Sequence, residues 1–359
     1  MIRKNPFYIL DIPMSAGGRQ IYAAAEELSL LEDPAECEDA ASTLINPIKR
    51  LAAELDWFPE CDEPVISSIR ESVSSGKAVD VGGLSEIRGI SMVNAEVYNM
   101  QLRNGSSEAD AGALSGADAA RQILALDYAL RGCGLADVLD AVNEKRRAAG
   151  ITLADSADLA AALADKRSRM VSEITKMLTL LDDEEYVTAA SLMAEQLRED
   201  PASSVGSVLP GLIDRYELQE QHLIQTQTEI LLKAAFRLEL LAMVFDIPGR
   251  LREFTARIEE WLRYVGPLIT VAALRGTENK MVADAAMDVR DLVRIISKAK
   301  YELTAYKFAR ILREYFADMP SVTEVLDRDI ENATSFIRNV YHKTPEEFEA
   351  RKWKGRSKI

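Results

Sequence analysis

Residues 216–245 read YELQEQHLIQTQTEILLKAAFRLELLAMVF, and this stretch decides the fold class. Its apolar residues recur in steps of seven, four and three, which places them along one face of an α-helix. At about 3.6 residues per turn, the stretch predicts a single helix of roughly nine turns. So long an apolar face must be covered by other helices, which predicts a helical bundle. The residues of this face are Tyr216, Leu223, Ile230, Ala234, Leu238, Leu241 and Phe245.

The sequence downstream supplies a partner for this helix. Residues 278–316 carry a comparable apolar stripe, and antiparallel pairing of the two stretches would bury both faces. A shorter helix over 250–264 is expected to connect them through Gly266-Pro267, and a last helix is expected over about 322–341. We therefore predict a long-helix antiparallel bundle domain over residues 205–345. The stripe consists of Val282, Val289, Leu292, Ile296, Leu303, Tyr306 and Ile311.

The sequence upstream predicts two further helical regions. Residues 60–200 hold shorter amphipathic segments separated by Gly82-Gly83, by residues 104–116 and by Gly150, and they predict a helical middle domain. Residues 1–59 predict a compact helical head, in which Pro34 and Pro47 mark breaks between helices. No segment alternates apolar and polar residues as a strand would, so the predicted fold class is all-α. In the head, the residues at helical spacing are Ile21, Ala24, Ala25, Leu28 and Leu31.

Charge and composition disfavour several classes of protein. The chain has 43 Lys and Arg against 58 Asp and Glu, a formal net charge of −15, which repels nucleic-acid phosphates and anionic lipids. No apolar run reaches the about 18–20 residues that cross a bilayer, and no secretory signal pattern follows Met1. We therefore expect a cytoplasmic protein without a membrane partner. Cys37, Cys61 and Cys133 lie far apart, which disfavours a disulfide framework.

The sequence lacks several common catalytic motifs. It has no G-x-x-x-x-G-K-[ST] phosphate loop, no G-x-S-x-G nucleophile motif, and no H-E-x-x-H or C-x-x-C motif. The two histidines, His222 and His342, are expected on solvated helix surfaces. We therefore predict no catalytic, cofactor-binding or metal-binding residue and no enzymatic activity. Carboxylates that folding brings together around a cation stay an open alternative.

The N-terminal region contains two recognisable stretches, Asn5-Pro6-Phe7-Tyr8-Ile9-Leu10-Asp11-Ile12, and Ser42 to Leu51 with Asn46-Pro47 at the junction of two helices. Together they resemble the DnaJ-type J-domain. The remainder is similar, at Leu212–Glu217 and Asp327–Ile330, to the long helical extension of a bacterial group of J-like proteins. The resemblance to the J-domain itself covers about residues 5–58. It implies a small helical fold with Glu32–Pro34 exposed at the tip of a hairpin. The core expected there consists of Ile9, Leu10, Ile21, Leu28, Leu44, Leu51 and Leu55.

The chain departs from this family at the family's functional tripeptide. Active J-domains carry His-Pro-Asp after a basic second helix, which docks on an acidic face of a seventy-kilodalton heat-shock chaperone. Here residues 31–36 read LEDPAE, and the helix before them carries Glu26 and Glu27, with Arg19 as its only basic residue. Charge of this sign opposes that docking. The resemblance therefore implies the fold, and the chaperone-stimulating residues are not carried over.

Three hypotheses follow. The first is a non-enzymatic cytosolic scaffold or adaptor with a degenerate J-like head; the second is a co-chaperone that delivers clients to a heat-shock chaperone; the third is an unrecognised carboxylate- or metal-dependent enzyme. The expected partner is a protein, either such a chaperone or a product of the same operon. Nucleic acid is considered only for the basic tail, residues 346–359, and the oligomeric state is left open. Candidate protein-binding residues are Arg19, Glu32, Asp33, Pro34, Arg351, Lys352, Trp353, Lys354 and Arg356.

Overall fold

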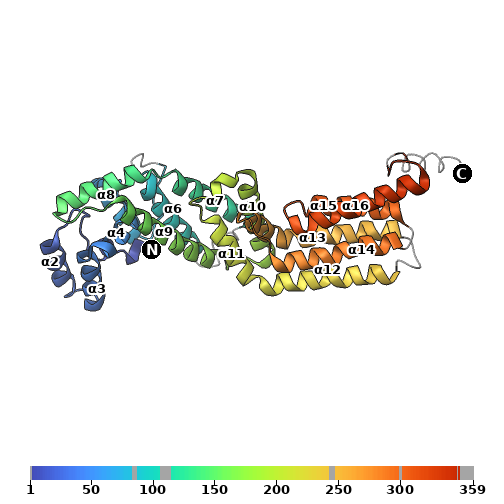
Figure 1. Ribbon diagram of the computed structural model, residues 1–359. Helices are drawn as coiled ribbons and strands as arrows, with labels where there is room; N and C mark the ends of the chain where they lie inside the picture. Colours follow the sequence, from blue (N-terminus) through green and yellow to red (C-terminus); the bar gives the residue numbers. More distant parts are fainter. Residues whose placement is uncertain are drawn as a thin grey trace. The chain divides into compact units, whose positions relative to one another are not determined.

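The computed structural model describes residues 2–82, 87–105, 115–241, 247–298, 301–345 and 347 (Figure 1). These residues form α-helices and two short 3-10 helices, and none of them forms a strand. The all-α prediction is therefore confirmed. Among the described helices, none combines the length and apolar character needed to cross a bilayer. The chain divides into two compact units, Met1–Ala189 with Ala202–Leu212, and Ala190–Pro201 with Ile213–Ile359.

The first unit begins with a short 3-10 helix (Ile2–Lys4) and four helices, α1 (Pro6–Ile9), α2 (Gly18–Leu28), α3 (Pro34–Ile45) and α4 (Pro47–Leu55). Three of these helices begin with the same device. The side chains of Asn5, Asp33 and Asn46 accept hydrogen bonds from the first backbone N–H groups, and each is followed by a proline. Helices α2 and α3 pack as a hairpin, and α3 also contacts α1 and α4.

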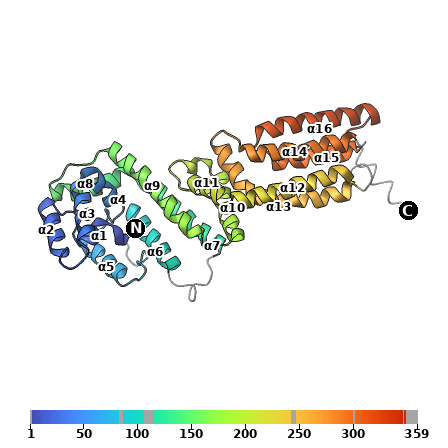
Figure 2. The same cartoon turned by 90° about the horizontal axis from the view of Figure 1, so that it is seen from below.

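The rest of the first unit consists of α5 (Glu63–Ser74), α6 (Gly89–Gly105), α7 (Gly116–Gly132), α8 (Leu135–Ala149), α9 (Ser156–Leu178) and the start of α10 (Asp183–Glu199). Figure 2 shows these helices from a second side. Helix α9 packs against both α4 and α8, and α6 packs against α7. A side chain at Gly116 would place its Cβ 1.9 Å from the main-chain oxygen of Glu185, so only glycine fits there.

The head does not have a core of its own. Leu10, Ile21 and Leu44 share one buried cluster with residues of α5 and α6, such as Ile69 and Tyr98. Of the other expected core residues, Ile9 and Leu28 pack at the edge of this cluster, and Leu51 and Leu55 are buried on α4 outside it. The domain boundaries drawn from the sequence, which are residues 1–59, 60–200 and 205–345, stay predictions.

The second unit is a bundle. It contains most of α11 (Leu209–Gln219), then α12 (Gln221–Leu241), α13 (Ile247–Leu274), α14 (Lys280–Lys298), α15 (Glu302–Tyr315) and α16 (Pro320–Tyr341). Helix α14 contacts α12, α13, α15 and α16, and Figures 1 and 2 show these helices side by side. The Trp261 ring meets Phe316 edge-on and its indole N–H donates to Thr228, 3.0 Å away. Trp261 is therefore part of the core of this bundle.

The prediction of one continuous helix over 216–245 is wrong. Helix α11 ends at Gln219 and α12 begins at Gln221, so the chain bends at Glu220, and residues 242–246 lie outside the described residues. The bend changes which face is covered: Ile230 is exposed, whereas Ile224 and Leu231 are buried. Each is displaced by one residue from a predicted position, about 100° around the helix. The partner stretch over 278–316 is likewise two helices, α14 and α15, which pack against each other.

The expected break at Gly266-Pro267 is also wrong, because α13 continues through Pro267 to Leu274. A proline inside a helix removes one backbone N–H and leaves the carbonyl four residues earlier without its helical donor. Here that carbonyl belongs to Arg263, and the Ser191 hydroxyl donates to it at 3.3 Å. The Tyr216 hydroxyl donates to the next carbonyl, that of Tyr264, at 3.0 Å. The Ser191 hydroxyl thus supplies the carbonyl of Arg263 with a donor in place of the N–H that proline lacks.

Candidate functional site

The α2–α3 hairpin ends in a short turn that is held by its own hydrogen bonds. The amides of Leu31 and Glu32 both donate to the carbonyl of Leu28, at 2.9 and 2.8 Å. On the other side, the Asp33 carboxylate accepts from the amide of Ala35 at 2.9 Å and caps α3. The turn therefore has a defined conformation.

Two consecutive leucines protrude from this turn. Leu30 is 84% exposed and Leu31 is 79% exposed, which places both among the four most exposed large hydrophobic residues in the described chain. Leu31 was expected to continue the apolar face of Ile21 and Leu28. That expectation is wrong because α2 stops at Leu28, and the turn directs the following residues away from the core. The periodicity of the sequence carried no signal for where the helix ends.

The candidate binding residues of the head fall into two places. Glu32, Asp33 and Pro34 are exposed at the tip of the hairpin, as expected. Arg19 is exposed in the first turn of α2, at the opposite end of the hairpin. The tail candidates Arg351, Lys352, Trp353, Lys354 and Arg356 lie outside the described residues.

A cavity of about 470 Å³ opens beside the tip. Its rim includes Leu28 and Glu32, the residues on either side of the turn that carries the exposed leucines. We call Leu30, Leu31 and this cavity the tip surface. The residues that line the cavity are Arg3, Tyr8, Ile9, Asp11, Leu28, Glu32, Glu36, Cys37, Arg70, Glu71 and Ser74.

The two cations of the tip surface are occupied by internal partners. Arg3 donates to the carbonyl of Val73 at 2.8 Å. Arg70 pairs with Asp11, donates to two main-chain carbonyls, and stacks over the Trp57 ring at 5.3 Å. These guanidinium groups therefore fix α5 and the N-terminal segment onto the head rather than offering positive charge to a ligand.

The acidic residues of the hairpin, in contrast to these two arginines, are exposed and have no ion-pair partner in the described chain. Residues 18–45 contain seven acidic residues and one basic residue, and all seven acids are exposed. None of them forms an ion pair in the described part of the chain. Burial together with the nearby carboxylates of Glu32 and Glu36 raises the pKa of the Cys37 thiol at the floor of the cavity. The tip surface is thus both apolar and negative. The acids are Glu26, Glu27, Glu32, Asp33, Glu36, Glu38 and Asp39.

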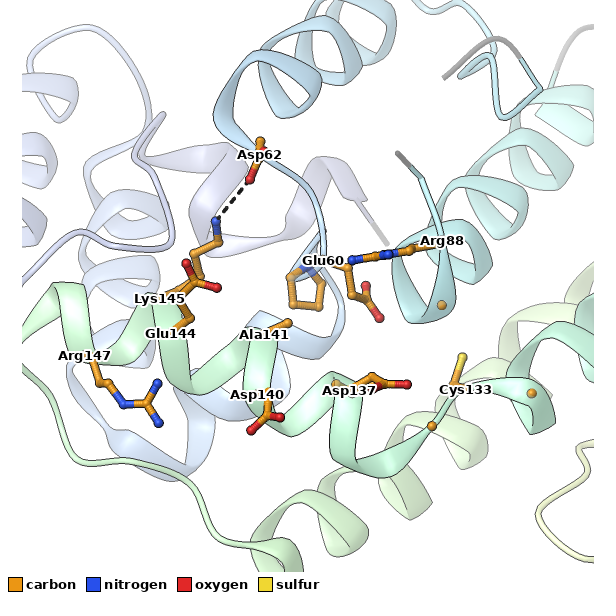
Figure 3. A pocket seen from close by; sticks show the side chains of 15 residues that line it. Glu60, Asp62, Arg88, Cys133, Asp137, Asp140, Ala141, Glu144, Lys145 and Arg147 are labelled. Carbon is orange, nitrogen blue, oxygen red and sulfur yellow. Dashed lines mark ion pairs between the residues drawn. The ribbon is translucent and has the colours of Figure 1, made fainter. Parts of the chain in front are cut away.

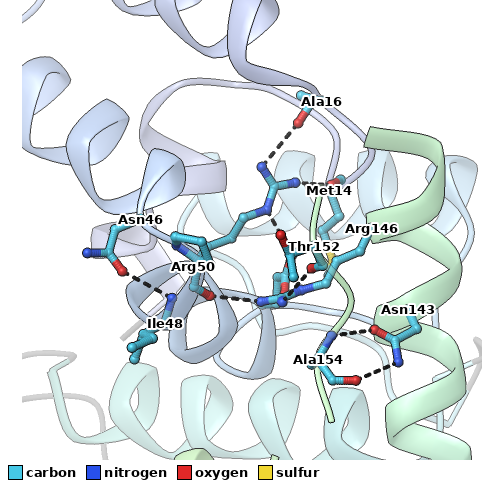
Figure 4. Close-up of polar contacts among 11 residues, drawn as sticks. Met14, Ala16, Asn46, Ile48, Arg50, Asn143, Arg146, Thr152 and Ala154 are labelled. Atoms are coloured by element: carbon cyan, nitrogen blue, oxygen red, sulfur yellow. Dashed lines mark hydrogen bonds and ion pairs between the residues drawn. The ribbon is translucent and has the colours of Figure 1, made fainter. Parts of the chain in front are cut away.

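A buried ionic network holds the base of the hairpin to the rest of the unit (Figure 4). Glu54 of α4 accepts from Arg50 at 2.9 Å and from Arg146 of α8 at 2.7 Å, and all three side chains are almost completely buried. Arg50 also donates to the carbonyls of Met14 and Ala16, in the segment that leads into α2. The network therefore fixes the start of α2 relative to α4 and α8.

A second cavity of about 940 Å³ lies between α8, the start of α6 and the loop after α4 (Figure 3). Asp137, Asp140 and Glu144 of α8 contribute carboxylates to its lining. Glu60 accepts from the amides of Ile90 and Ser91 and thereby caps α6. Burial and the Glu60 charge raise the pKa of Cys133 to about 11, so this thiol is protonated at neutral pH.

In the part of the chain that is described, no group of three or more His, Cys, Asp or Glu residues lies close enough to hold a metal ion. Comparison with known proteins gives no match: no family model, no curated protein and no solved structure is similar to this chain. The tip surface combines two consecutive exposed leucines, a cavity, and carboxylates that form no ion pair in the described chain.

Proposed function

We propose that this chain is a non-enzymatic cytoplasmic scaffold or adaptor that docks a protein partner through the tip of a J-like head. The single observation that carries the proposal is the pair of exposed leucines, Leu30 and Leu31, on a turn held by hydrogen bonds. An isolated exposed leucine is ordinary in folded proteins. Two consecutive ones beside a cavity form an apolar contact site, which is a common mark of protein interfaces.

The arrangement of α1 to α4 supports the J-like part of the proposal. A short first helix, a helical hairpin and a fourth helix follow one another in the order that the family's pattern implies. The acidic hairpin and the missing His-Pro-Asp favour a partner other than the acidic docking face of a heat-shock chaperone.

Site-specific photocrosslinking in the native host tests the proposal. A photoreactive phenylalanine analogue replaces Leu31 in one variant and Leu180, another exposed leucine of the first unit, in a matched control. The expected result is one discrete crosslinked protein at position 31 that is absent at position 180 and disappears when Leu30 is changed to Ser. Equal crosslinking at both positions would refute docking at the tip.

Single-turnover ATP hydrolysis by the cognate seventy-kilodalton chaperone separates the scaffold from the co-chaperone. The scaffold hypothesis expects the same hydrolysis rate with and without this protein. A stimulation of about tenfold or more, about 1.4 kcal/mol of barrier, would overturn it in favour of the co-chaperone.

A further inference from the structure

We infer that the tip surface binds a segment rich in Lys and Arg that carries a bulky apolar side chain. This inference rests on the proposed function and names the chemistry of the partner. Its first support is charge: Glu32 and Glu36 lie at the cavity without an ion pair in the described chain, whereas Arg3 and Arg70 are held by internal partners. A cationic ligand would therefore meet negative charge that is not already neutralised.

The second support is the apolar part of the surface. Leu30 and Leu31 project beside a cavity whose lining includes Tyr8, Ile9 and Leu28. A ligand that carries only positive charge would leave these side chains in contact with water. A basic segment with one large apolar residue covers both kinds of surface, as an anchor in a cavity with a charged rim does in many interfaces.

The third support is preorganisation. The turn is closed by the amides of Leu31 and Glu32 on the Leu28 carbonyl, and Asp33 caps the next helix. Arg50 fixes the segment that enters α2. A ligand would therefore meet a surface that needs little ordering on binding, which preserves affinity. Nucleic acids and anionic membranes are repelled by the same carboxylates.

Fluorescence polarisation with labelled synthetic peptides tests the inference on the full-length protein. Three amphipathic peptides share the same leucines and differ only in their polar residues, which are lysine, glutamine or glutamate. The lysine peptide should bind most tightly, and its affinity should fall as salt rises from about 50 to 500 mM, because added ions screen exposed charges. Equal affinity for the lysine and glutamine peptides would overturn the charge selection.

Matched variants separate the tip surface from the overall negative charge of the protein. The variant Glu32→Gln with Glu36→Gln should weaken binding of the lysine peptide about tenfold. The variant Asp140→Asn with Glu144→Gln, which removes the same charge from exposed residues of α8, should leave it unchanged. An equal loss in both variants would show that the peptide senses only net charge, and the inference would fail.

The apolar part has its own control. Leu30→Ser with Leu31→Ser should weaken lysine-peptide binding about tenfold or more, whereas Leu180→Ser should not. Charge reversal by Glu32→Lys with Glu36→Lys should transfer the preference to the glutamate peptide, which a general unfolding of the hairpin would not do. If no peptide binds while a crosslinked partner is still found at position 31, the partner chemistry is wrong and the docking proposal stands.

Discussion

Removal of Arg146 should destabilise the first unit strongly, although this residue lies far in sequence from the head. Its guanidinium donates to Glu54 at 2.7 Å, to the carbonyl of Thr152 at 3.1 Å and to that of Pro47 at 3.0 Å. The change Arg146→Met keeps much of the aliphatic length and removes all three donors. It leaves a buried carboxylate with Arg50 as its remaining cation.

The expected cost can be bounded. Breaking a buried ion pair by removing one partner typically costs about 3–5 kcal/mol, because the other charge stays desolvated. Domains have only about 5–15 kcal/mol of stability in total. For a unit of this size, about 2–4 °C of melting temperature is lost per kcal/mol, so Arg146→Met should lower the melting temperature by about 6–20 °C.

The pH dependence gives a second and independent readout. Burial raises the pKa of Glu54 above that of the unfolded chain, against the opposing charges of Arg146 and Arg50. Between the unfolded and the folded pKa the folded state binds more protons, so the stability from this group is present in acid and is lost as pH rises. Without Arg146 the pKa of Glu54 rises further, so the defect of the variant should be largest near neutral pH and should shrink in acid.

Chemical denaturation followed by circular dichroism measures the effect, and hydrogen exchange in α4 and α8 localises it. The exposed pair of Arg121 with Asp118 gives the control, because Arg121→Met should leave the denaturation midpoint unchanged. A single variant within about 1 kcal/mol of the parent at neutral pH would refute the assigned role of the network.

Three further outcomes are expected. Iodoacetamide should alkylate Cys133 about 100-fold more slowly in the folded chain than in the unfolded chain at mildly alkaline pH, because the raised pKa leaves less of the reactive thiolate. The rate in the folded chain should keep rising towards pH 11, which mass spectrometry can follow. Gly116→Ala should destabilise by about 1–3 kcal/mol or more, because its Cβ would overlap main chain, whereas Gly132→Ala meets no neighbour and should be tolerated in the same melting assay. Ser191→Ala should lower the free energy of unfolding by about 0.5–1.5 kcal/mol in the parent chain, which has Pro267. In a Pro267→Ala background the same change should cost almost nothing, because a backbone N–H again donates to the carbonyl of Arg263. Equal costs in both backgrounds would contradict this account.

Sequence periodicity predicted well which segments are helical, and poorly where the helices bend or end. The apolar spacing around Tyr216 and Leu238 correctly indicated buried helical faces, because the spacing depends only on local geometry. It could not show the bend at Glu220, after which Ile224 and Leu231 are buried in place of Leu223 and Ile230, although the face again includes Leu238 further along α12. Pro267 led to the opposite error: the local rule demands a break, but the Ser191 hydroxyl from another helix serves the carbonyl that the proline leaves without its helical donor.

The same distinction applies to the candidate site. The negative charge of the hairpin and the exposure of Glu32–Pro34 could be predicted, since charge is read from composition and a capped turn from Asp33-Pro34. The exposure of Leu31 could not, because it depends on α2 ending at Leu28 rather than one turn later. Arg146 also gave no signal, because the carboxylate that it contacts lies 92 residues earlier in the chain.

The buried network and the exposed tip are mechanically related. A docking surface on a hairpin is useful to a scaffold only if the hairpin keeps its orientation while force or a partner acts on its end. Arg50 satisfies two carbonyls in the segment before α2 and one oxygen of Glu54, and Arg146 satisfies the other oxygen from α8. The two arginines thus connect the base of the hairpin to helices that the head alone does not contain. The buried charges of the first unit therefore hold the hairpin in position, and the proposal assigns recognition of a partner to its exposed carboxylates, which form no ion pair in the described chain.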